Sequence, residues 1–309
     1  MTAAPLRIAT RKSPLALWQA EHVALRLRAA HPGTEVVLLP MSTKGDQIQD
    51  RSLAAIGGKG LFIKELEIAL EEHRADLAVH SMKDVPADLP AQFTIGAVLE
   101  RADPRDALVA PRARSLEELP SGARVGTSSL RRRAQLLGLR PDLRIEALRG
   151  NLHTRIRRLD EDSLDAIVLA CAGLARLGWE QRIAARLPLE VSLPAVGQGA
   201  IGVECRAGDT AVLERLAALE HAPTRVAVDA ERAFSRRLGG SCQSPVAAHA
   251  TLDGGRLALH GLVASPDGRR MLRDAQIGTA GAAAALGETL AQRMLAAGAR
   301  EILATLAEG

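Results

Sequence analysis

The chain has 309 residues, of which 47% are hydrophobic and 25% are charged, and its formal net charge is +4. This length and apolar content suit two or three domains with buried cores. Only 2% of the residues are aromatic and Tyr is absent, so most stacking platforms for single-stranded nucleic acid are missing and we expect no nucleic-acid partner.

The first 217 residues repeat one pattern, in which a short apolar strand leads through a polar bend into an amphipathic helix. A strand at residues 6–10 precedes a helix at residues 13–31, which Ser13 can cap and Pro14 can start. Further strands are expected at residues 34–42, 75–80, 106–111, 123–126, 143–147 and 164–170, and further helices at residues 61–73, 126–137, 151–159 and 171–178. This alternation is typical of α/β domains with mostly parallel sheets.

From Ala222 the pattern changes to that of a separate α+β domain. A helix at residues 224–240 ends at a Gly pair. Three strand-like runs follow at residues 245–252, 256–264 and 269–277, separated by DGG and PDG turns. We therefore expect a small antiparallel sheet at the C-terminal end.

Cations and hydroxyl groups gather where the predicted parallel strands end. Because ligands of such sheets bind beyond the carboxyl ends of the strands, these residues predict an anion site. The residues at the strand ends, which include one carboxylate, one amide and one thiol, are Arg11, Ser13, Ser81, Lys83, Asp84, Thr127, Ser128, Ser129, Arg131, Arg132, Arg133, Arg149, Asn151, Arg155, Cys171 and Arg176.

The stretch GTSSLRRRAQLL, residues 126–137, places three consecutive arginines in the first turn of a helix. A helix start already carries roughly half a positive charge and unpaired N–H groups. Arg131, Arg132 and Arg133 would therefore repel it unless a negative group lies opposite them. The stretch predicts such an anion.

Asp84 is a single carboxylate among these cations. One interpretation is an Asx turn before Pro86 with a local ion pair to Lys83, because Asp is a common turn residue. The other is a carboxylate that stabilises positive charge on a substrate intermediate.

The polar stretch at residues 43–60 has two interpretations as well. It can be a solvated loop, or a lid over the crevice that moves about Gly57, Gly58 and Gly60, with Lys59 as its charged contact.

Gly197, Gly199 and Gly202 in VGQGAIG have the spacing of a dinucleotide-binding fingerprint. That motif needs a strand before it and a helix after it, whereas Pro194 breaks the preceding run and the following AIGVEC is strand-like. A nicotinamide-dependent dehydrogenase is therefore disfavoured.

The three cysteines, Cys171, Cys205 and Cys242, are far apart and lack C-x-x-C spacing, which argues against disulfides and a metal site. A cytoplasmic protein fits this usage, and no apolar run approaches the roughly 20 residues of a membrane span. Cys242 lies in a loop of small residues near Arg236 and Arg237, which favours a reactive thiolate. Cys171 and Cys205 adjoin apolar runs and are interpreted as structural.

Several stretches together resemble the porphobilinogen deaminase (hydroxymethylbilane synthase) family over nearly the whole chain. They are RKSPLALWQ (11–19), TKGD (43–46), GGKGLFIKELE (57–67), HSMKDVP (80–86), GTSSLRRRAQL (126–136), LRGNLHTR (148–155), LPAVGQGAIGVECR (193–206) and GGSCQSPVAAHA (239–250). The resemblance implies a transferase of tetrapyrrole biosynthesis that condenses four porphobilinogen molecules head to tail, with release of ammonia, into linear hydroxymethylbilane.

The resemblance also implies a covalent cofactor without a metal: a dipyrromethane primer held by a thioether to Cys242. Asp84 would be the catalytic acid. Residues that would bind cofactor and substrate are Arg11, Ser13, Lys59, Ser81, Lys83, Thr127, Ser128, Ser129, Arg131, Arg132, Arg149, Gly150, Arg155, Arg176 and Gln198. The cysteine loop departs from the commoner family pattern at Ser241, Ser244 and Val246, which puts its packing in doubt more than the attachment.

The family fold implies two α/β domains similar to periplasmic anion-binding proteins and a smaller α+β domain that carries the cofactor. The expected boundaries are residues 1–99 with 200–217, residues 100–199, and residues 218–309. A monomer is expected. The alternative function is a non-catalytic, two-lobed anion-binding or effector-sensing protein, which would need neither Asp84 nor a modified cysteine.

Overall fold

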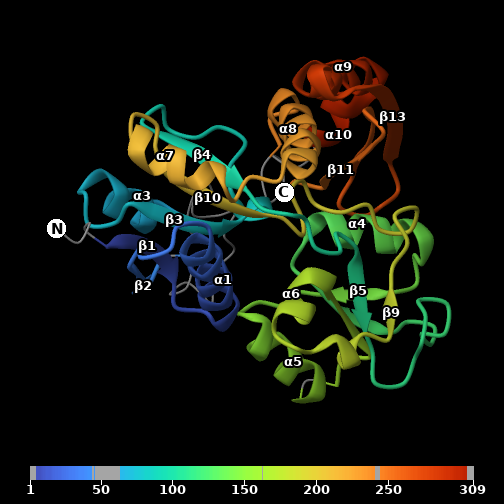
Figure 1. Cartoon of the computed structure of the whole chain (residues 1–309). Helices are drawn as coiled ribbons and strands as arrows, with labels where there is room; N and C mark the ends of the chain where they lie inside the picture. The colour runs from blue at the N-terminus through green and yellow to red at the C-terminus, as the bar shows by residue number, and fades with distance from the viewer. Residues whose placement is uncertain (1–4, 44, 46–62, 162, 241–243, 305–309) are drawn as a thin grey trace. The chain divides into compact units, whose positions relative to one another are not determined.

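The computed structural model describes residues 5–43, 45, 63–161, 163–240 and 244–304 (Figure 1). The chain forms two compact units, residues 1–101 with 200–225 and residues 102–199 with 226–309. The last boundary falls inside helix α8 (Ala222–Arg237).

The first unit is built on a five-stranded sheet with the order β2-β1-β3-β10-β4. Its strands are β1 (Leu6–Arg11), β2 (Val36–Met41), β3 (Leu77–Ser81), β4 (Phe93–Val98) and β10 (Ile201–Arg206). β1 pairs in parallel with β2 and β3, whereas β10 runs antiparallel to β3 and β4. The sheet is therefore mixed rather than mostly parallel, because β10 enters it without a crossover helix.

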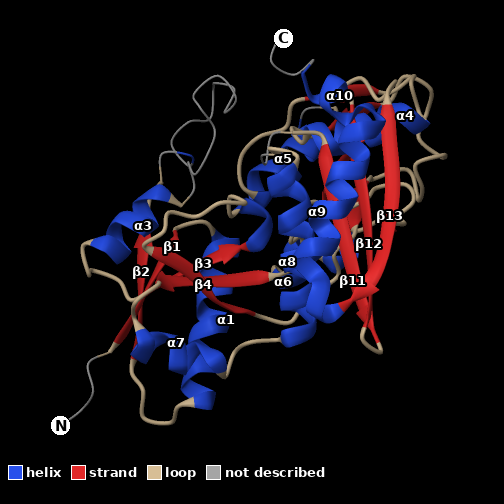
Figure 2. Cartoon of the chain, turned by 90° about the horizontal axis from the view of Figure 1, so that it is seen from above, coloured by secondary structure: helices blue, strands red, loops and turns tan. Residues whose placement is uncertain are grey.

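Helices cover both faces of this sheet (Figure 2). Helices α1 (Pro14–Ala30) and α7 (Thr210–Ala217) share a core with Ile8 of β1, and helix α3 (Lys64–Glu71) packs with the neighbouring Ala9 on the other face. Successive strand residues point to opposite faces, so a run such as LRIAT supplies both cores.

The second unit contains a sheet with the order β7-β6-β8-β5-β9. Its strands are β5 (Asp106–Val109), β6 (Arg124–Gly126), β7 (Arg144–Glu146), β8 (Ala166–Ala170) and β9 (Ala185–Arg186). β6 is parallel to β7 and β8, and β5 is antiparallel to β8 and β9. Its helices are α4 (Leu130–Leu139) on one face, and α5 (Leu152–Glu161) and α6 (Cys171–Arg176) on the other.

The same unit contains the predicted antiparallel sheet. It consists of β11 (Val246–Asp253), β12 (Arg256–Ala264) and β13 (Met271–Thr279), followed by helices α9 (Ala283–Met294) and α10 (Arg300–Ala304). One face packs on α8, α9 and α10 (Figure 2). On the other face, Leu262 and Ala264 join a core with Ala134 of α4. The expected fold class, α/β sheets with a C-terminal three-stranded antiparallel sheet, is confirmed.

Candidate active site

A pocket lies in the first unit where the parallel strands β1 and β3 end. Its lining residues are Arg11, Ser13, Leu15, Ala16, Gln19, Ile63, Val79, His80, Ser81 and Asp84. Three of them can carry a charge: Arg11, His80 and Asp84. Four of the residues predicted from strand ends, namely Arg11, Ser13, Ser81 and Asp84, are therefore brought together.

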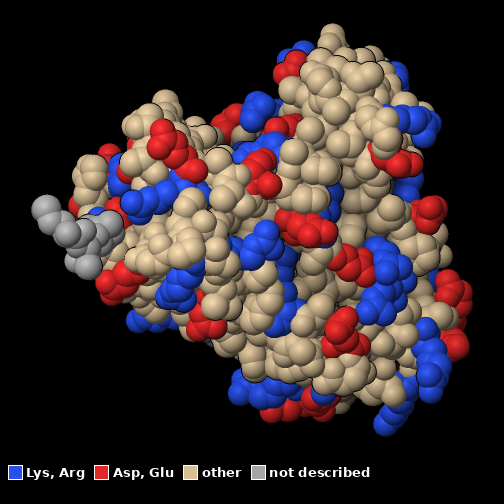
Figure 3. Space-filling model, in the orientation of Figure 1, with Lys and Arg blue, Asp and Glu red and all other residues tan. Residues whose placement is uncertain are grey.

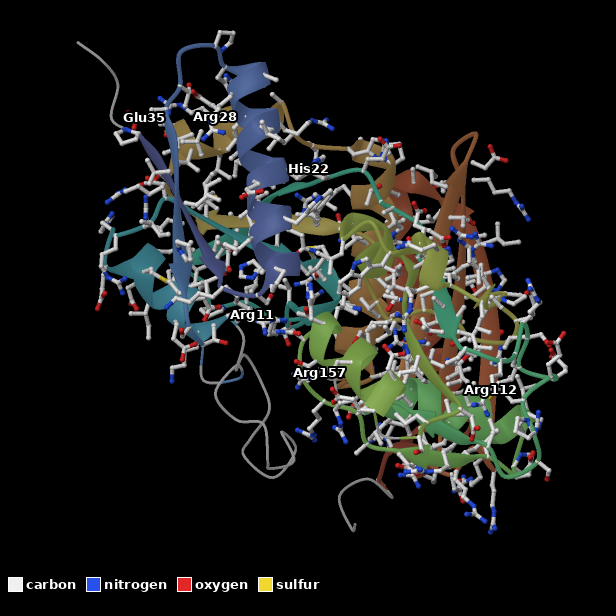
Figure 4. All side chains as sticks on the ribbon, turned by 90° about the horizontal axis from the view of Figure 1, so that it is seen from below. Arg11, His22, Arg28, Glu35, Arg112 and Arg157 are labelled. Atoms are coloured by element: carbon white, nitrogen blue, oxygen red, sulfur yellow. The ribbon has the colours of Figure 1, made fainter. Side chains whose placement is uncertain are left out.

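The first turn of α1 shapes one side of this pocket. The Ser13 hydroxyl caps the helix by accepting a hydrogen bond from the Ala16 N–H at 3.4 Å, and Pro14 starts it, as predicted. Gln19 then reaches across to β3 and donates from Nε2 to the Ser81 Oγ at 2.7 Å. Figure 4 shows Arg11 where β1 ends beside this turn.

Asp84 follows β3 on a single helical turn, Met82–Asp84, which the Val85 N–H closes by donating to the Met82 carbonyl at 3.2 Å. Within the described residues, the Asp84 carboxylate has neither a hydrogen-bond donor nor a salt-bridge partner. The ion pair with Lys83, one of the two interpretations of Asp84, is thus not formed, and the carboxylate is available to a ligand. Lys83 lies on the same turn and does not line the pocket.

The second unit holds a buried charge cluster around Asp106, the first residue of β5. Arg131 donates from Nη1 to the Asp106 Oδ2 at 2.7 Å, and Arg132 donates from Nη2 to the Oδ1 at 2.7 Å. Ser192 Oγ and Gln198 Nε2 complete the cluster with bonds to the same carboxylate at 2.7 and 2.9 Å. Asp106 is fully buried, and Arg131 and Arg132 are 4% and 5% exposed.

The structure thus supplies an anion opposite the arginines of α4, and it belongs to the chain itself. Burial alone would raise the pKa of Asp106, but the charges of Arg131 and Arg132 outweigh it and hold that pKa far below its usual range. Two guanidinium groups face one carboxylate, so the cluster keeps one excess positive charge. The predicted role of Arg131 and Arg132 in binding a ligand remains a prediction.

The loops after β6 and β7 meet beside this cluster. Ser128 donates from Oγ to the Leu148 carbonyl at 2.9 Å, and Ser129 caps α4 by accepting from the Arg132 N–H at 3.4 Å. The Thr127 Oγ1 accepts from the Ser129 N–H at 3.2 Å. Ser129 is therefore the N-cap residue of α4.

Two further predicted cations contact backbone carbonyls. Arg155 donates from Nε to the Gly150 carbonyl at 2.8 Å, and Gly150 has a φ of 104°, which favours glycine. Arg176 donates from Nη2 to the Gly199 carbonyl at 2.7 Å. Burial lowers the pKa of Arg176 to about 10, so a bound anion would stabilise its charge. Arg149 is partly buried at the end of the β7 loop.

Two predicted residues, Lys59 and Cys242, lie outside the described residues, as does most of the predicted lid at residues 43–60. The predicted residues are divided between the units. Arg11, Ser13, Ser81, Lys83 and Asp84 belong to the first, and the set from Thr127 to Gln198 belongs to the second.

Four polar residues of these sites were not predicted from the sequence: Gln19, His80, Asp106 and Ser192. Asp106 begins an antiparallel strand, so it lies at the edge where the neighbouring parallel strands end. A sequence pattern shows where a strand lies and not its direction.

Cys171 and Cys205 are buried, as expected for structural cysteines. Burial raises the pKa of Cys171 to about 12 and that of Cys205 to about 11. Both thiols are therefore protonated at neutral pH and poorly reactive.

VGQGAIG has the context expected from the sequence. Gly197 and Gly199 lie in a turn with φ of 69° and 91°, and strand β10 follows at Ile201. A dinucleotide site needs a helix at that point, so the dehydrogenase alternative has no structural support.

In the described part of the chain, no His, Cys, Asp or Glu side chains are grouped as a metal site would require. No described helix is long and apolar enough to cross a membrane. Charges of both signs are interspersed on the face drawn in Figure 3, without a patch of one sign.

The fold and these sites define an α/β protein that combines polar strand-end sites with a C-terminal three-stranded antiparallel sheet. The family model "Porphobilinogen deaminase, dipyromethane cofactor binding domain" matches residues 6–214, and "Porphobilinogen deaminase, C-terminal domain" matches residues 226–296. The chain belongs to the porphobilinogen deaminase family.

Curated relatives match along nearly the whole chain. Porphobilinogen deaminase of Xanthomonas euvesicatoria pv. vesicatoria is 59% identical over 302 residues, which cover 97% of this chain and 99% of the relative. That of Syntrophotalea carbinolica is 55% identical over 306 residues, which cover 99% and 97%. Among solved structures, the periplasmic VFT2 domain of Bordetella pertussis BvgS is 15% identical with a TM-score of 0.44, covering 69% of this chain and 86% of that one.

Proposed function

We propose that this chain condenses four porphobilinogen molecules head to tail, releases ammonia at each step, and finally releases linear hydroxymethylbilane by hydrolysis. The main support for this proposal is the match of the two family models to residues 6–214 and 226–296. The pocket supports it, because Asp84 lies beside Arg11 with no partner among the described residues. A non-catalytic anion-binding protein would not need this carboxylate.

The described residues suit the dipyrromethane cofactor named by the first family model. Dipyrromethane carries carboxylate side groups, for which guanidinium groups are the preferred partners. The Asp106 cluster has one excess positive charge, and the lowered pKa of Arg176 means that a nearby anion would stabilise its charge. When bound, the cofactor supplies the free pyrrole α-carbon to which a new unit is joined.

We propose that Cys242 holds the cofactor through a thioether and that a set of polar residues binds cofactor and substrate. This set is Arg11, Ser13, Lys59, Ser81, Lys83, Thr127, Ser128, Ser129, Arg131, Arg132, Arg149, Gly150, Arg155, Arg176 and Gln198. For Arg131 and Arg132, the small exposed fraction means that few N–H groups are left for a ligand. We therefore propose that Arg131 and Arg132 supply positive charge to the site as much as they contact the ligand directly.

Asp84 is the proposed catalytic residue. Loss of ammonia from the aminomethyl group of porphobilinogen leaves a positive charge on the pyrrole. A carboxylate that accepts a hydrogen bond from the pyrrole N–H stabilises this charge. Arg11, which lines the same pocket, suits a substrate carboxylate.

The remaining expectations complete the proposal. The protein works in the cytoplasm as a monomer, its substrate is porphobilinogen, and it needs neither nucleic acid nor a membrane.

Asp84→Asn tests the catalytic assignment, because it keeps the shape of the side chain and removes its charge. We expect a folded protein whose rate of ammonia release from porphobilinogen falls on the order of 100- to 1000-fold. Asp253→Asn, at the exposed end of β11, is the matched control and should retain full activity. Near-normal turnover by Asp84→Asn would reject the assignment.

A further inference from the structure

A buried acid–base pair lies behind the Asp84 pocket and has no role in the chemistry described so far. His80 of β3 contacts Glu204 of β10 through a hydrogen bond of 2.8 Å between Nε2 and Oε2. His80 is 5% exposed and Glu204 is fully buried. The antiparallel register pairs His80 with Gly202, so Glu204 is its diagonal neighbour on the same face of the sheet.

A second carboxyl group, that of Glu67 on α3, is close enough to interact with this pair. Burial raises the pKa of Glu67, and the charge of Glu204 raises it further, while His80 acts in the opposite direction. Among the described residues, Glu67 Oε1 and Glu204 Oε1 are buried without a hydrogen-bond partner. Two buried carboxyl groups so close together are costly as charged groups, which favours the protonated form of Glu67.

His80 also lines the pocket that contains Asp84. Of the three ionisable groups in this lining, Arg11 is a guanidinium that donates hydrogen bonds and has no acceptor atom for a proton. Asp84 is committed as a carboxylate to the pyrrole N–H in the proposed function. His80 is the remaining residue of this lining whose side chain can act as a general base.

Each condensation must dispose of one proton. The C–N bond of the aminomethyl group breaks and its electron pair leaves with ammonia. A C–C bond forms from the π electrons of the free α-carbon, which then loses its proton so that the C–H pair restores the aromatic ring. This proton needs an acceptor. The cycle is balanced when the acceptor then passes the proton to ammonia or water.

We propose that His80, oriented and charge-balanced by Glu204, accepts the proton that the attacked α-carbon loses. The proposal rests on the proposed function and adds to it a second proton-carrying group. Glu204 is a positioning residue, because it acts through the imidazole. The groups that face His80 are Glu204 of β10 and Glu67 of α3, with Lys64 and Glu71 on the same helix, and the pocket residues Arg11 and Asp84.

The test compares His80→Asn and Glu204→Gln with the wild type. Both variants should carry the same covalent cofactor by intact mass and show a similar KM for porphobilinogen. For His80→Asn we expect kcat to fall about 100-fold or more, because the α-carbon then lacks its proton acceptor. Glu204→Gln should lower kcat to a smaller extent.

The matched control is His22→Asn, on α1, whose ring stacks on Trp18 and does not line the pocket. A second readout is independent of turnover. The imidazole N–H proton resonance of the His80–Glu204 hydrogen bond should vanish in both test variants and persist in His22→Asn.

A kcat of His80→Asn within threefold of the wild type would overturn the proposal. If His80→Asn does not fold, the Glu204→Gln variant tests the proposal instead. An unchanged kcat together with an unchanged N–H resonance in that variant would overturn the proposal. Failure of the proposed function looks different, because the wild type itself would then release no ammonia from porphobilinogen.

Discussion

At the scale of the residue, the most informative contact is that of Arg131 and Arg132 with Asp106. The sequence predicts an anion opposite the arginines because a helix start repels cations. The sequence does not show that this anion is Asp106, which lies 25 residues before Arg131. The pairing depends on the antiparallel direction of β5, which hydrophobic patterns do not encode.

Asp106→Asn is predicted to destabilise the protein by about 3–5 kcal/mol, because it leaves two buried guanidinium groups without their carboxylate. Denaturant unfolding measures this change. The control is Asp160→Asn, which removes a surface pair with Arg182 and should cost less than about 1 kcal/mol. Equal stability of the two variants would refute the structural role of the cluster.

The same carboxylate should make stability depend on pH. The folded-state pKa of Asp106 is depressed, so its contribution is fully present above the ordinary carboxyl value of about 4 and is lost as pH falls below it. Unfolding free energies measured between pH 7 and 3 should therefore decline more steeply for the wild type than for Asp106→Asn. Parallel curves would contradict the assignment.

The cysteines give a prediction that separates the structural thiols from the attachment site. Cys171 and Cys205, with pKa values raised to about 12 and 11, should resist alkylation at pH 8 in the folded protein. After unfolding, two of the three cysteines should react if Cys242 is blocked by a thioether. Three labels on the unfolded wild type would contradict the blockage, and mass spectrometry counts them.

At the scale of the element, the expected helices and strands are found, because their signals are local. The Ser13 cap, the alternating strand residues and the turns around the antiparallel sheet each depend on a few neighbouring residues. The mixed sheets were not predicted, since period-two patterns are the same for either strand direction. The His80–Glu204 pair was missed for a related reason: its partners lie 124 residues apart.

Helices α8 and α9 approach each other closely at Gly287. A Cβ atom added there would clash with the Ala230 carbonyl oxygen. It would also lie only 2.8 Å from the Phe234 backbone nitrogen. Gly287→Ala should therefore lower the Tm by several degrees, because the backbone of α8 cannot yield as a flexible side chain would. Gly281→Ala, where a Cβ atom meets nothing within 4 Å, should leave the Tm nearly unchanged.

Similar thermal transitions of both glycine variants would show that the two helices are not in such close contact. Differential scanning calorimetry on the full chain measures both.

At the scale of the whole molecule, the described units place Asp84 in the first and the Asp106 cluster in the second. The resemblance predicts three domains, whereas the compact units number two, since the antiparallel sheet shares a core with α4. The boundaries of the three predicted domains remain a prediction. Which residues bind which pyrrole ring depends on long-range arrangement, which local sequence signals do not define.

We propose that this enzyme works on a covalently held, carboxylate-rich cofactor. The most direct measurement is the intact mass of the protein purified from cells, beside that of Cys242→Ser. We predict that the wild type exceeds its sequence mass by one dipyrromethane and that Cys242→Ser does not. A wild-type mass equal to that of the bare sequence, with the variant differing only by its substitution, would contradict the account.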